Sequence, residues 1–267
     1  MLIDFHTHAF PDRLAEKAIG KLSAVSGMTP HFDGTISDLK NKMKALGVDY
    51  SVILNIATNA KQQDNVNAFA KEINDAGDNL VAFGSVHPLS EHPKDDVFAL
   101  ADAGFRGIKL HPDYASIVID DERYAPIFAA AAETGLIVVI HAGYDFISPN
   151  KIHATPDRIL KVLAAHPSLT LVCAHMGANE MWEEVLEKLC GKNVYFDTSL
   201  VAGSLSPELA EKIILNHDEN KILFGSDMPW ESAESSKKLI DMLTIPTAIK
   251  EKIFYRNAAR LLSLPIV

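Results

Sequence analysis

Cysteine is scarce in this sequence, which contains Cys173 and Cys190 and no others among 267 residues. Both fall in or beside segments that we predict to be strand and helix. Disulfide-dependent folds carry several cysteines at short spacings, and that framework is missing here. The sequence therefore predicts a protein of a reducing compartment, and we expect a cytoplasmic location.

Basic residues are also few. Lys and Arg number 25 against 35 Asp and Glu, so the formal net charge is −10. Nucleic-acid binding draws mainly on cationic contacts to phosphates, and no run of Lys or Arg stands out. We therefore expect a small-molecule substrate and no nucleic-acid partner. The sequence is compatible with a homo-oligomer but carries no signal for one.

Long apolar runs are absent as well. None approaches the roughly 20 residues of a membrane span, and no stretch has the layout of a secretory leader. We expect neither membrane insertion nor secretion. A Gly-x-Gly-x-x-Gly segment and a Walker lysine motif are missing too, which disfavours an open nucleotide-binding sheet.

Short apolar runs alternate with helical patterns along the chain. This alternation favours a parallel sheet, and eight runs at this length fit a closed (β/α)8 TIM barrel better than an open sheet. We predict one α/β domain over residues 1–267. The predicted strands are Leu2–Phe5, Tyr50–Ile56, Leu80–Val86, Gly107–Leu110, Leu136–Ile140, Leu169–Ala174, Val194–Phe196 and Ile222–Phe224.

Helical spacing of apolar residues marks the segments between these runs. The longest connection, between His8 and Tyr50, holds two predicted helical pieces, and it is a candidate cover for the barrel mouth. The last segment of the chain is predicted to form one amphipathic helix that starts near a proline. The predicted helices are Pro11–Val25, Ile36–Leu46, Asn65–Asp75, Ala125–Thr134, Asp157–Ala165, Pro207–Asn216 and Pro246–Leu262.

Histidines gather where the predicted strands end. His6 and His8 alternate with Thr7 and so project from one face of a strand, where they can bind one metal ion. The carboxyl ends of barrel strands converge on one rim, so residues distant in sequence meet there. Such nitrogen and oxygen donors suit zinc or a similar divalent ion. The residues at these ends are His6, His8, His87, His111, His141, His175 and Asp227.

These motifs together resemble the amidohydrolase superfamily, and most closely its aminocarboxymuconate-semialdehyde-decarboxylase-like branch, amidohydrolase family 2. They are His-x-His at strand one, His141, the segments Val172–Gly177 and Gly107–Pro112, Gly-Ser-Asp-x-Pro around Asp227, and the tail Asn257–Leu262. The resemblance covers nearly the whole chain. It implies a metallo-dependent-hydrolase barrel with a single metal ion, bound by His6, His8, His141 and Asp227, with His175 beside the metal-bound water.

The fourth predicted strand separates this chain from related branches. Deoxyribonucleases of the barrel group would carry Glu-Ile-Gly there, where this chain has Gly-Ile-Lys. Binuclear members use a carboxylated lysine near the position of Lys109, so carboxylation of Lys109 stays open. We nevertheless expect one divalent ion, with zinc preferred over manganese or another ion, and no second metal.

The chemistry of these groups suggests their roles. A divalent ion makes hydroxide available near neutral pH, and either His175 or Asp227 could take the proton of that water. Lys109 would supply positive charge to a substrate carboxylate or oxyanion, the alternative being a lysine that extends to solvent. Other substrate-side candidates are His111, which is equally suited to a structural role, and the aromatic residues Phe10 and Trp230.

The remaining candidates have weaker signals. Asp4 shares the strand face of His6 and either orients a ligand or bonds to the backbone. Cys173 is read as core, and His87 is left out of the site. Five histidines in predicted loops or helix ends are expected at the surface: His31, His92, His153, His166 and His217.

The strand-end residues and the family resemblance leave three alternative functions. The first is a metal-dependent hydrolase that uses activated water on a small carboxylate-bearing amide, ester or lactone. The second keeps the metal but is a lyase, a decarboxylase or hydratase of a small unsaturated or aromatic carboxylic acid. The third is a barrel that binds a metal or ligand without catalysis.

Overall fold

The eight predicted apolar runs form eight parallel strands in the computed structural model, which describes residues 1–265. Each predicted strand is confirmed, with ends shifted by a few residues at most. The predicted single domain covers residues 1–267, of which 266 and 267 lie outside the described part. The strands are β1 Ile3–Thr7, β2 Tyr50–Leu54, β3 Leu80–Phe83, β4 Gly107–Leu110, β5 Ile137–Ile140, β6 Leu171–Cys173, β7 Tyr195–Asp197 and β8 Ile222–Leu223.

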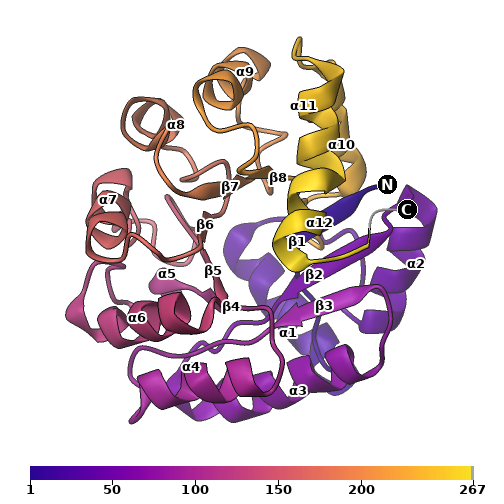
Figure 1. Ribbon diagram of the computed structural model, residues 1–267. Helices are drawn as coiled ribbons and strands as arrows, with labels where there is room; N and C mark the ends of the chain where they lie inside the picture. Colours follow the sequence, from indigo (N-terminus) through magenta and orange to yellow (C-terminus); the bar gives the residue numbers. More distant parts are fainter. Residues whose placement is uncertain (266–267) are drawn as a thin grey trace.

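The strands close into a barrel in chain order. β1 to β3 and β4 to β8 form continuous parallel ladders, and two junctions join them. At the first, the backbone N–H of Gly84 donates to the carbonyl of Gly107 at 3.0 Å. At the second, Phe5 N–H donates to the Phe224 carbonyl at 2.8 Å. The predicted (β/α)8 barrel is therefore confirmed, and Figure 1 shows the helices arranged around it.

The helices lie between the strands as the sequence predicts. The tail is divided, with a π-helical turn at Lys252–Arg256 between two short α-helices. The α-helices are α1 Asp12–Ser26, α2 Ile36–Leu46, α3 Gln63–Asp75, α4 Pro93–Asp102, α5 Pro112–Ala115, α6 Ala125–Thr134, α7 Pro156–Ala165, α8 Trp182–Glu184, α9 Pro207–Asn216, α10 Ala233–Met242, α11 Thr247–Glu251 and α12 Asn257–Leu262. Shorter turns are η1 Ala60–Gln62, η2 Glu122–Tyr124 and η3 Val185–Leu189.

Local sequence signals explain where several helices start and stop. Thr155 and Ser206 accept hydrogen bonds from backbone N–H groups in the first turns of α7 and α9, and a proline follows each of them. Such caps satisfy N–H groups that have no partner within the helix. At the other end, Gly27 and Gly47 close α1 and α2 in the left-handed conformation. Within residues 1–265, no helix is both long and apolar enough to span a membrane.

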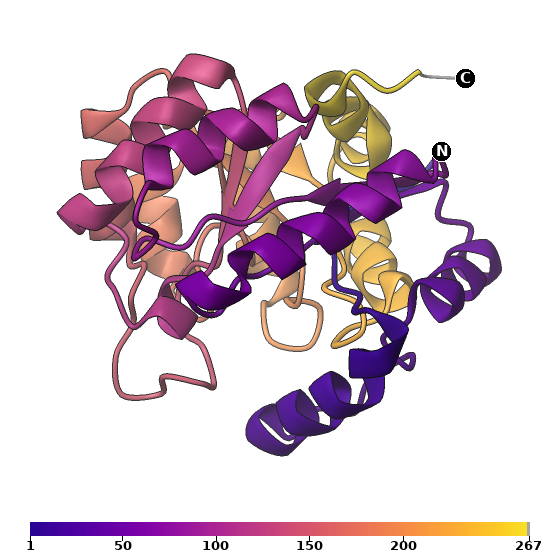
Figure 2. The same ribbon diagram turned by 90° about the horizontal axis from the view of Figure 1, so that it is seen from below.

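The core has two parts. A large cluster packs the strands against the surrounding helices. A smaller one includes Val52 of β2 and Val139 of β5, strands that do not pair, so it lies inside the barrel. β5 is buried at all four positions, as expected for a parallel strand covered on both faces. The segment between β1 and β2 stays near the strand ends, where His31 N–H donates to the Pro229 carbonyl at 2.8 Å. Figure 2 shows α1 extending beyond the barrel.

Gly107 gives a direct test of the barrel packing. A Cβ atom at this position of β4 would lie 2.4 Å from the Phe83 ring and 2.5 Å from the Ile137 carbonyl oxygen. We expect Gly107→Ala to lower the free energy of unfolding by about 1–3 kcal/mol, because overpacking displaces neighbouring groups. Urea unfolding followed by circular dichroism measures it. Gly20→Ala, a change in α1 with no atom within 4 Å, is the control. Equal midpoints for Gly107→Ala and wild type would contradict this packing.

Candidate functional site

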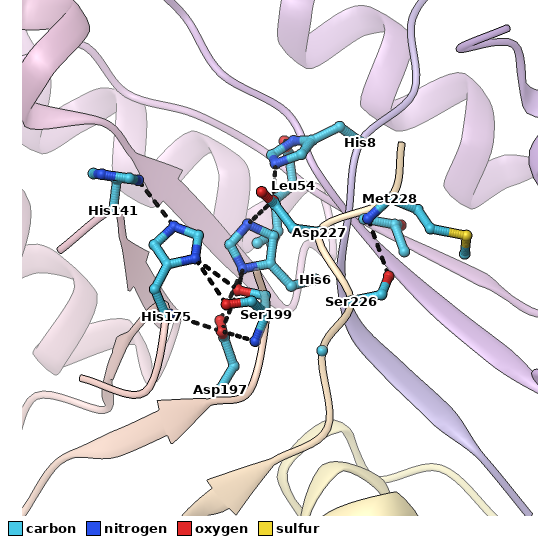
Figure 3. Close-up of polar contacts among 12 residues, drawn as sticks. His6, His8, Leu54, His141, His175, Asp197, Ser199, Ser226, Asp227 and Met228 are labelled. Carbon is cyan, nitrogen blue, oxygen red and sulfur yellow. Dashed lines mark hydrogen bonds and ion pairs between the residues drawn. The ribbon is translucent and has the colours of Figure 1, made fainter. Parts of the chain in front are cut away.

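Six of the predicted site residues lie at the carboxyl ends of the barrel strands. His6 is in β1, and His8 follows it directly. Lys109 is in β4, whereas His141, His175 and Asp227 follow β5, β6 and β8. Figure 3 shows the histidine rings and the Asp227 carboxylate turned toward one another. The sequence prediction that these strand ends converge is confirmed.

His6, His8 and Asp227 form the tightest group. The Nε2 atoms of His6 and His8 lie 3.1 and 3.0 Å from the same oxygen, Asp227 Oδ1. Burial, followed by the charge of Lys109, holds the pKa of His6 well below its usual value, so its ring is neutral. Burial alone would raise the pKa of Asp227, but the adjacent imidazoles hold it below its usual range, so it is a carboxylate.

The other ring nitrogens show where the protons sit. His6 Nδ1 lies 2.9 Å from Asp197 Oδ2, and His8 Nδ1 lies 2.9 Å from the Leu54 carbonyl. Both partners accept hydrogen bonds, so each Nδ1 carries a hydrogen, and in the neutral form of each ring Nε2 presents a lone pair. Two lone pairs thus face one carboxylate oxygen. That arrangement is repulsive without a cation and fits a divalent metal ion, for which imidazole and carboxylate are ordinary ligands.

Asp197, at the end of β7, was not singled out in the sequence. It is fully buried. Besides holding His6, it accepts hydrogen bonds through Oδ1 from the backbone N–H of His175 at 3.1 Å and from Ser199 Oγ at 2.5 Å. A carboxylate that fixes the ring of a ligand histidine tunes metal affinity. Its position at a strand end was the available signal.

His175 and His141 form a second contact beside the first group. His175 Nε2 lies 3.0 Å from His141 Nδ1, and His175 Nδ1 lies 3.1 Å from the Ser199 carbonyl. Burial is the main cause that lowers the pKa of each imidazole to about 4. Both rings are therefore neutral near pH 7, and His175 is suited to accept a proton.

Lys109 is buried, with 1% of its surface exposed. Its ammonium group lies 3.4 Å from His6 Nε2, so the side chain points at the metal-binding group and does not extend to solvent. Burial lowers the pKa of Lys109 to about 8, against the opposing effect of Asp197 and Asp227. A positive charge thus adjoins the donors.

His111 joins His141 on the other side. The two rings stack with centroids 4.5 Å apart and planes at 12°. Asp145, which the sequence analysis did not single out, lies 3.4 Å from His111 Nε2 and 3.3 Å from His141 Nε2. The donor atoms of these three residues lie within 4.8 Å of one another, as do those of His6, His8 and Asp227.

The structure gives Asp4 a clear role, but it does not test the substrate contacts predicted for Phe10 and Trp230. Asp4 accepts hydrogen bonds from Ser226 Oγ and from the His6 N–H at 3.2 Å, and burial raises the pKa of Asp4 to about 7. Asp4 therefore holds the end of β1 against the segment that follows β8. The Phe10 ring borders Gly34 in the loop after β1. Trp230 is half-buried just past Asp227, so both aromatic contacts with substrate stay predictions.

Two of the five histidines expected at the surface are buried, so that expectation was wrong for them. His153 contacts Asp113 at 2.8 Å. His217 stacks on Phe196, with centroids 4.2 Å apart, and its Nε2 donates to the Val194 carbonyl. Polar partners within the fold make their burial stable, and sequence spacing does not reveal such partners.

Comparisons with known proteins identify the family and the fold. A family model described as amidohydrolase matches residues 3–264. A probable dihydroorotase of Schizosaccharomyces pombe is 27% identical over 135 residues, which are 47% of this chain and 40% of that protein. The match thus spans about two fifths of that curated relative.

Similar solved structures cover nearly the whole chain. An uncharacterized TIM-barrel protein from Bordetella bronchiseptica has a TM-score of 0.78 at 20% identity, over 98% of each chain. 5-Carboxyvanillate decarboxylase from Sphingomonas paucimobilis has a TM-score of 0.74 at 16% identity, over 99% of each chain. A variant 5-carboxyvanillate decarboxylase from Novosphingobium aromaticivorans, with bound manganese, has a TM-score of 0.69 at 17% identity, over 99% of this chain and 97% of that one. These likenesses show the fold.

Asp197→Asn tests the histidine orientation. The amide keeps the shape of the side chain but loses the charge that holds the Nδ1–H of His6. We expect metal affinity to fall roughly 10–100-fold, as for other carboxylates that orient ligand histidines. Competition with a chromophoric chelator measures it, and circular dichroism checks the fold. Asp102→Asn, at an exposed position of α4, is the control. A folded Asp197→Asn protein with wild-type affinity would show that Asp197 does not tune the site.

Proposed function

Because the chain belongs to amidohydrolase family 2, a family of metal-dependent enzymes, we propose that it is a metal-dependent decarboxylase of a small aromatic or unsaturated carboxylic acid. This is the lyase alternative of the sequence analysis. Similar folds in 5-carboxyvanillate and 2,6-dihydroxybenzoate decarboxylases support it over the hydrolase reading. Family membership also favours an enzyme over a barrel that only binds.

His6, His8 and Asp227 are the proposed metal ligands. Their donor atoms lie within 4.8 Å of one another, and the Nε2 atoms of both histidines face the same oxygen, Asp227 Oδ1. His141 was predicted as a fourth ligand, and that stays a prediction, since its Nδ1 is turned toward His175. Zinc or manganese fits two imidazoles and a carboxylate. Such an ion supplies positive charge that polarises a bound oxygen.

The observation that carries the proposal is the buried ammonium group of Lys109 beside these ligands. A divalent ion and Lys109 together would bring three positive charges, and the acidic side chains that act on Lys109 are Asp197, Asp227 and Asp145. The His6 imidazole, which burial keeps neutral, adds no charge. Buried charge is costly unless it is paired, and a substrate carboxylate is a further group with which the Lys109 ammonium could pair. A carboxylate that bridges Lys109 and the metal-binding group would form this pair.

His175 is the proposed proton carrier. In decarboxylation the bond between the carboxylate carbon and its neighbour breaks, carbon dioxide leaves, and the neighbouring carbon keeps the electron pair and takes a proton. The neutral His175 ring can accept a proton from a substrate hydroxyl or water through Nε2 and return it to that carbon. The Ser199 carbonyl holds the ring at Nδ1.

A hydrolase remains the second candidate, because the same neutral His175, or Asp227, could take a proton from water. That water would then attack an amide, ester or lactone. The two reactions differ in their products. Hydrolysis adds an oxygen from water to the substrate, whereas decarboxylation releases carbon dioxide and adds one hydrogen from solvent.

Product analysis tests the proposal. Metal-loaded protein is incubated with 5-carboxyvanillate, 2,6-dihydroxybenzoate and other aromatic and unsaturated acids, beside a panel of amides, esters and lactones, in deuterated and in 18O-labelled water. We expect carbon dioxide, and one deuterium at the carbon that lost the carboxylate. Products that contain 18O without carbon dioxide would favour the hydrolase and overturn the decarboxylase.

Lys109→Met then tests substrate binding. The change removes the ammonium group, and a hydrogen bond to a charged group contributes about 1.5–3 kcal/mol, so KM should rise roughly 10–100-fold. Metal content should stay near the wild-type value, which elemental analysis checks. His92→Gln, at an exposed position, should leave KM unchanged. An unaltered KM in Lys109→Met would show that Lys109 does not bind the carboxylate.

A further inference from the structure

Asp145 lies in the loop after β5, beside two imidazoles of the site. Its Oδ2 atom lies 3.3 Å from His141 Nε2 and 3.4 Å from His111 Nε2. The Asp145 side chain is 14% exposed, so it is largely shielded from solvent. No step of the proposed reaction uses this carboxylate, and its place beside His141 raises the question of what it does there.

The loop holds the Asp145 carboxylate in one orientation. Its Oδ1 atom accepts a hydrogen bond from the backbone N–H of Ile147 at 2.7 Å. The loop is anchored at Tyr144, whose N–H donates to the Asn179 carbonyl and whose carbonyl accepts from Asn179 Nδ2, each at 3.0 Å. Oδ1 is thus engaged within the loop, and Oδ2 is left to meet the imidazoles.

The Nε2 atom of His141 faces two acceptors. One is Asp145 Oδ2, and the other is the Tyr144 carbonyl oxygen at 3.2 Å. An ionised carboxylate and a carbonyl only accept hydrogen bonds, so a hydrogen on Nε2 suits both contacts and a lone pair there suits neither. In the neutral form of the ring, a hydrogen on Nε2 leaves the lone pair on Nδ1.

The other side of the same ring favours the opposite tautomer. His141 Nδ1 lies 3.0 Å from His175 Nε2. Because His175 Nδ1 faces the Ser199 carbonyl at 3.1 Å, His175 carries its hydrogen there, and its Nε2 could accept one from His141. The two sides of the His141 ring thus compete for one hydrogen. Asp145 decides the competition, since a charged acceptor forms a hydrogen bond roughly twice as strong as a neutral one.

The position of this hydrogen determines whether His141 can bind a metal ion. A ring nitrogen with a lone pair can be a ligand, whereas one that carries a hydrogen cannot. Stacking on His111, with centroids 4.5 Å apart, also limits the tilt of the His141 ring. With the hydrogen on Nε2, the Nδ1 lone pair is turned toward His175 and the proposed metal ligands (Figure 3).

We propose that Asp145 is a positioning residue, which holds the hydrogen of His141 on Nε2 and so keeps Nδ1 free for the metal ion. The inference rests on the proposed function for the predicted role of His141 as the fourth ligand. Asp145 would then do for His141 what Asp197 does for His6, from the opposite ring nitrogen. Carboxylates that bind the second nitrogen of a ligand histidine commonly fix its tautomer.

Nitrogen NMR of the metal-free protein tests the tautomer. Ring nitrogens with and without a hydrogen differ in 15N chemical shift, so 15N-histidine-labelled protein near pH 8 shows where the hydrogen lies. The His141 signals are those missing from a His141→Gln variant. We expect the hydrogen on Nε2 in wild type. In Asp145→Ala two neutral acceptors compete, Tyr144 on one side and His175 on the other, so we expect a mixture of both tautomers.

Asp145→Asn should reverse the tautomer. The Ile147 N–H keeps the amide oxygen at the position of Oδ1, so the amide NH₂ group replaces Oδ2 and donates toward His141 Nε2. A lone pair is then favoured on Nε2 and the hydrogen on Nδ1. A purely structural role predicts the opposite order of damage, because alanine also loses the contact with Ile147 and asparagine keeps it.

Metal affinity gives the second readout, by competition for Zn²⁺ with a chromophoric chelator. Asp145→Asn should bind Zn²⁺ roughly 10–100-fold more weakly than wild type. Asp145→Ala should lose less, because the Tyr144 carbonyl still accepts the Nε2 hydrogen. Asp102→Asn, at an exposed position of α4, should keep wild-type affinity. Circular dichroism checks every fold.

Several outcomes would overturn the inference. They are a hydrogen on His141 Nδ1 in the wild type, an unchanged tautomer in Asp145→Ala, wild-type affinity in Asp145→Asn, and a larger loss in Asp145→Ala than in Asp145→Asn. If Asp145→Asn does not fold, the tautomers of wild type and Asp145→Ala decide. Neither readout involves the reaction, so a protein that hydrolyses its substrate but shows the expected tautomers and affinities would overturn the decarboxylase and leave the role of Asp145 standing.

Discussion

The pairing of β1 with β8 is the constraint on which the site depends. It closes the barrel and places His6 beside Asp227, 221 residues later in the chain, where the Asp227 N–H donates to the His6 carbonyl at 2.8 Å. Asp4 strengthens the junction by accepting a hydrogen bond from the Ser226 N–H at 2.9 Å. Gly225 permits the approach, since a Cβ there would lie 2.9 Å from His6 Cβ. Without this junction, the first group of donors would not exist.

Burial then gives these donors their chemistry. The imidazoles of His6, His8 and His175 are fixed at Nδ1 by Asp197, Leu54 and Ser199, and turn Nε2 toward the site. The backbone also contributes to the placement of two of these side chains. His175 and Asp227 adopt the left-handed conformation, with φ values of 60° and 73°. Such left-handed non-glycine residues cost about 1–3 kcal/mol each and tend to occur where function requires them. Here they lie two residues after the end of β6 and four residues after the end of β8, where both side chains reach the site.

The sequence predicted what depends on local pattern. Apolar runs such as Ile137–Ile140 marked the strands, because buried parallel strands are apolar throughout. Histidines at strand ends marked the rim, because a barrel brings these ends together. Asp197 and Asp145 escaped notice, since an acidic residue after a strand is as often solvated as buried. His153 and His217 were misplaced for the converse reason, because the carboxylate and carbonyl that bury them lie 40 and 23 residues away.

Dependence on contacts between distant residues also explains why the substrate is harder to infer than the metal-binding residues. Metal donors must lie a few ångströms apart, so a rigid barrel and fixed tautomers define them. A substrate contacts loops as well, and Phe10 and Trp230 lie on loops after β1 and β8 whose course depends on distant packing. Charge still narrows the choice, because Lys109 is buried beside the donors at the end of β4 and favours a substrate that carries a negative charge there. The buried lysine therefore constrains the substrate class more than the shape of the loops does.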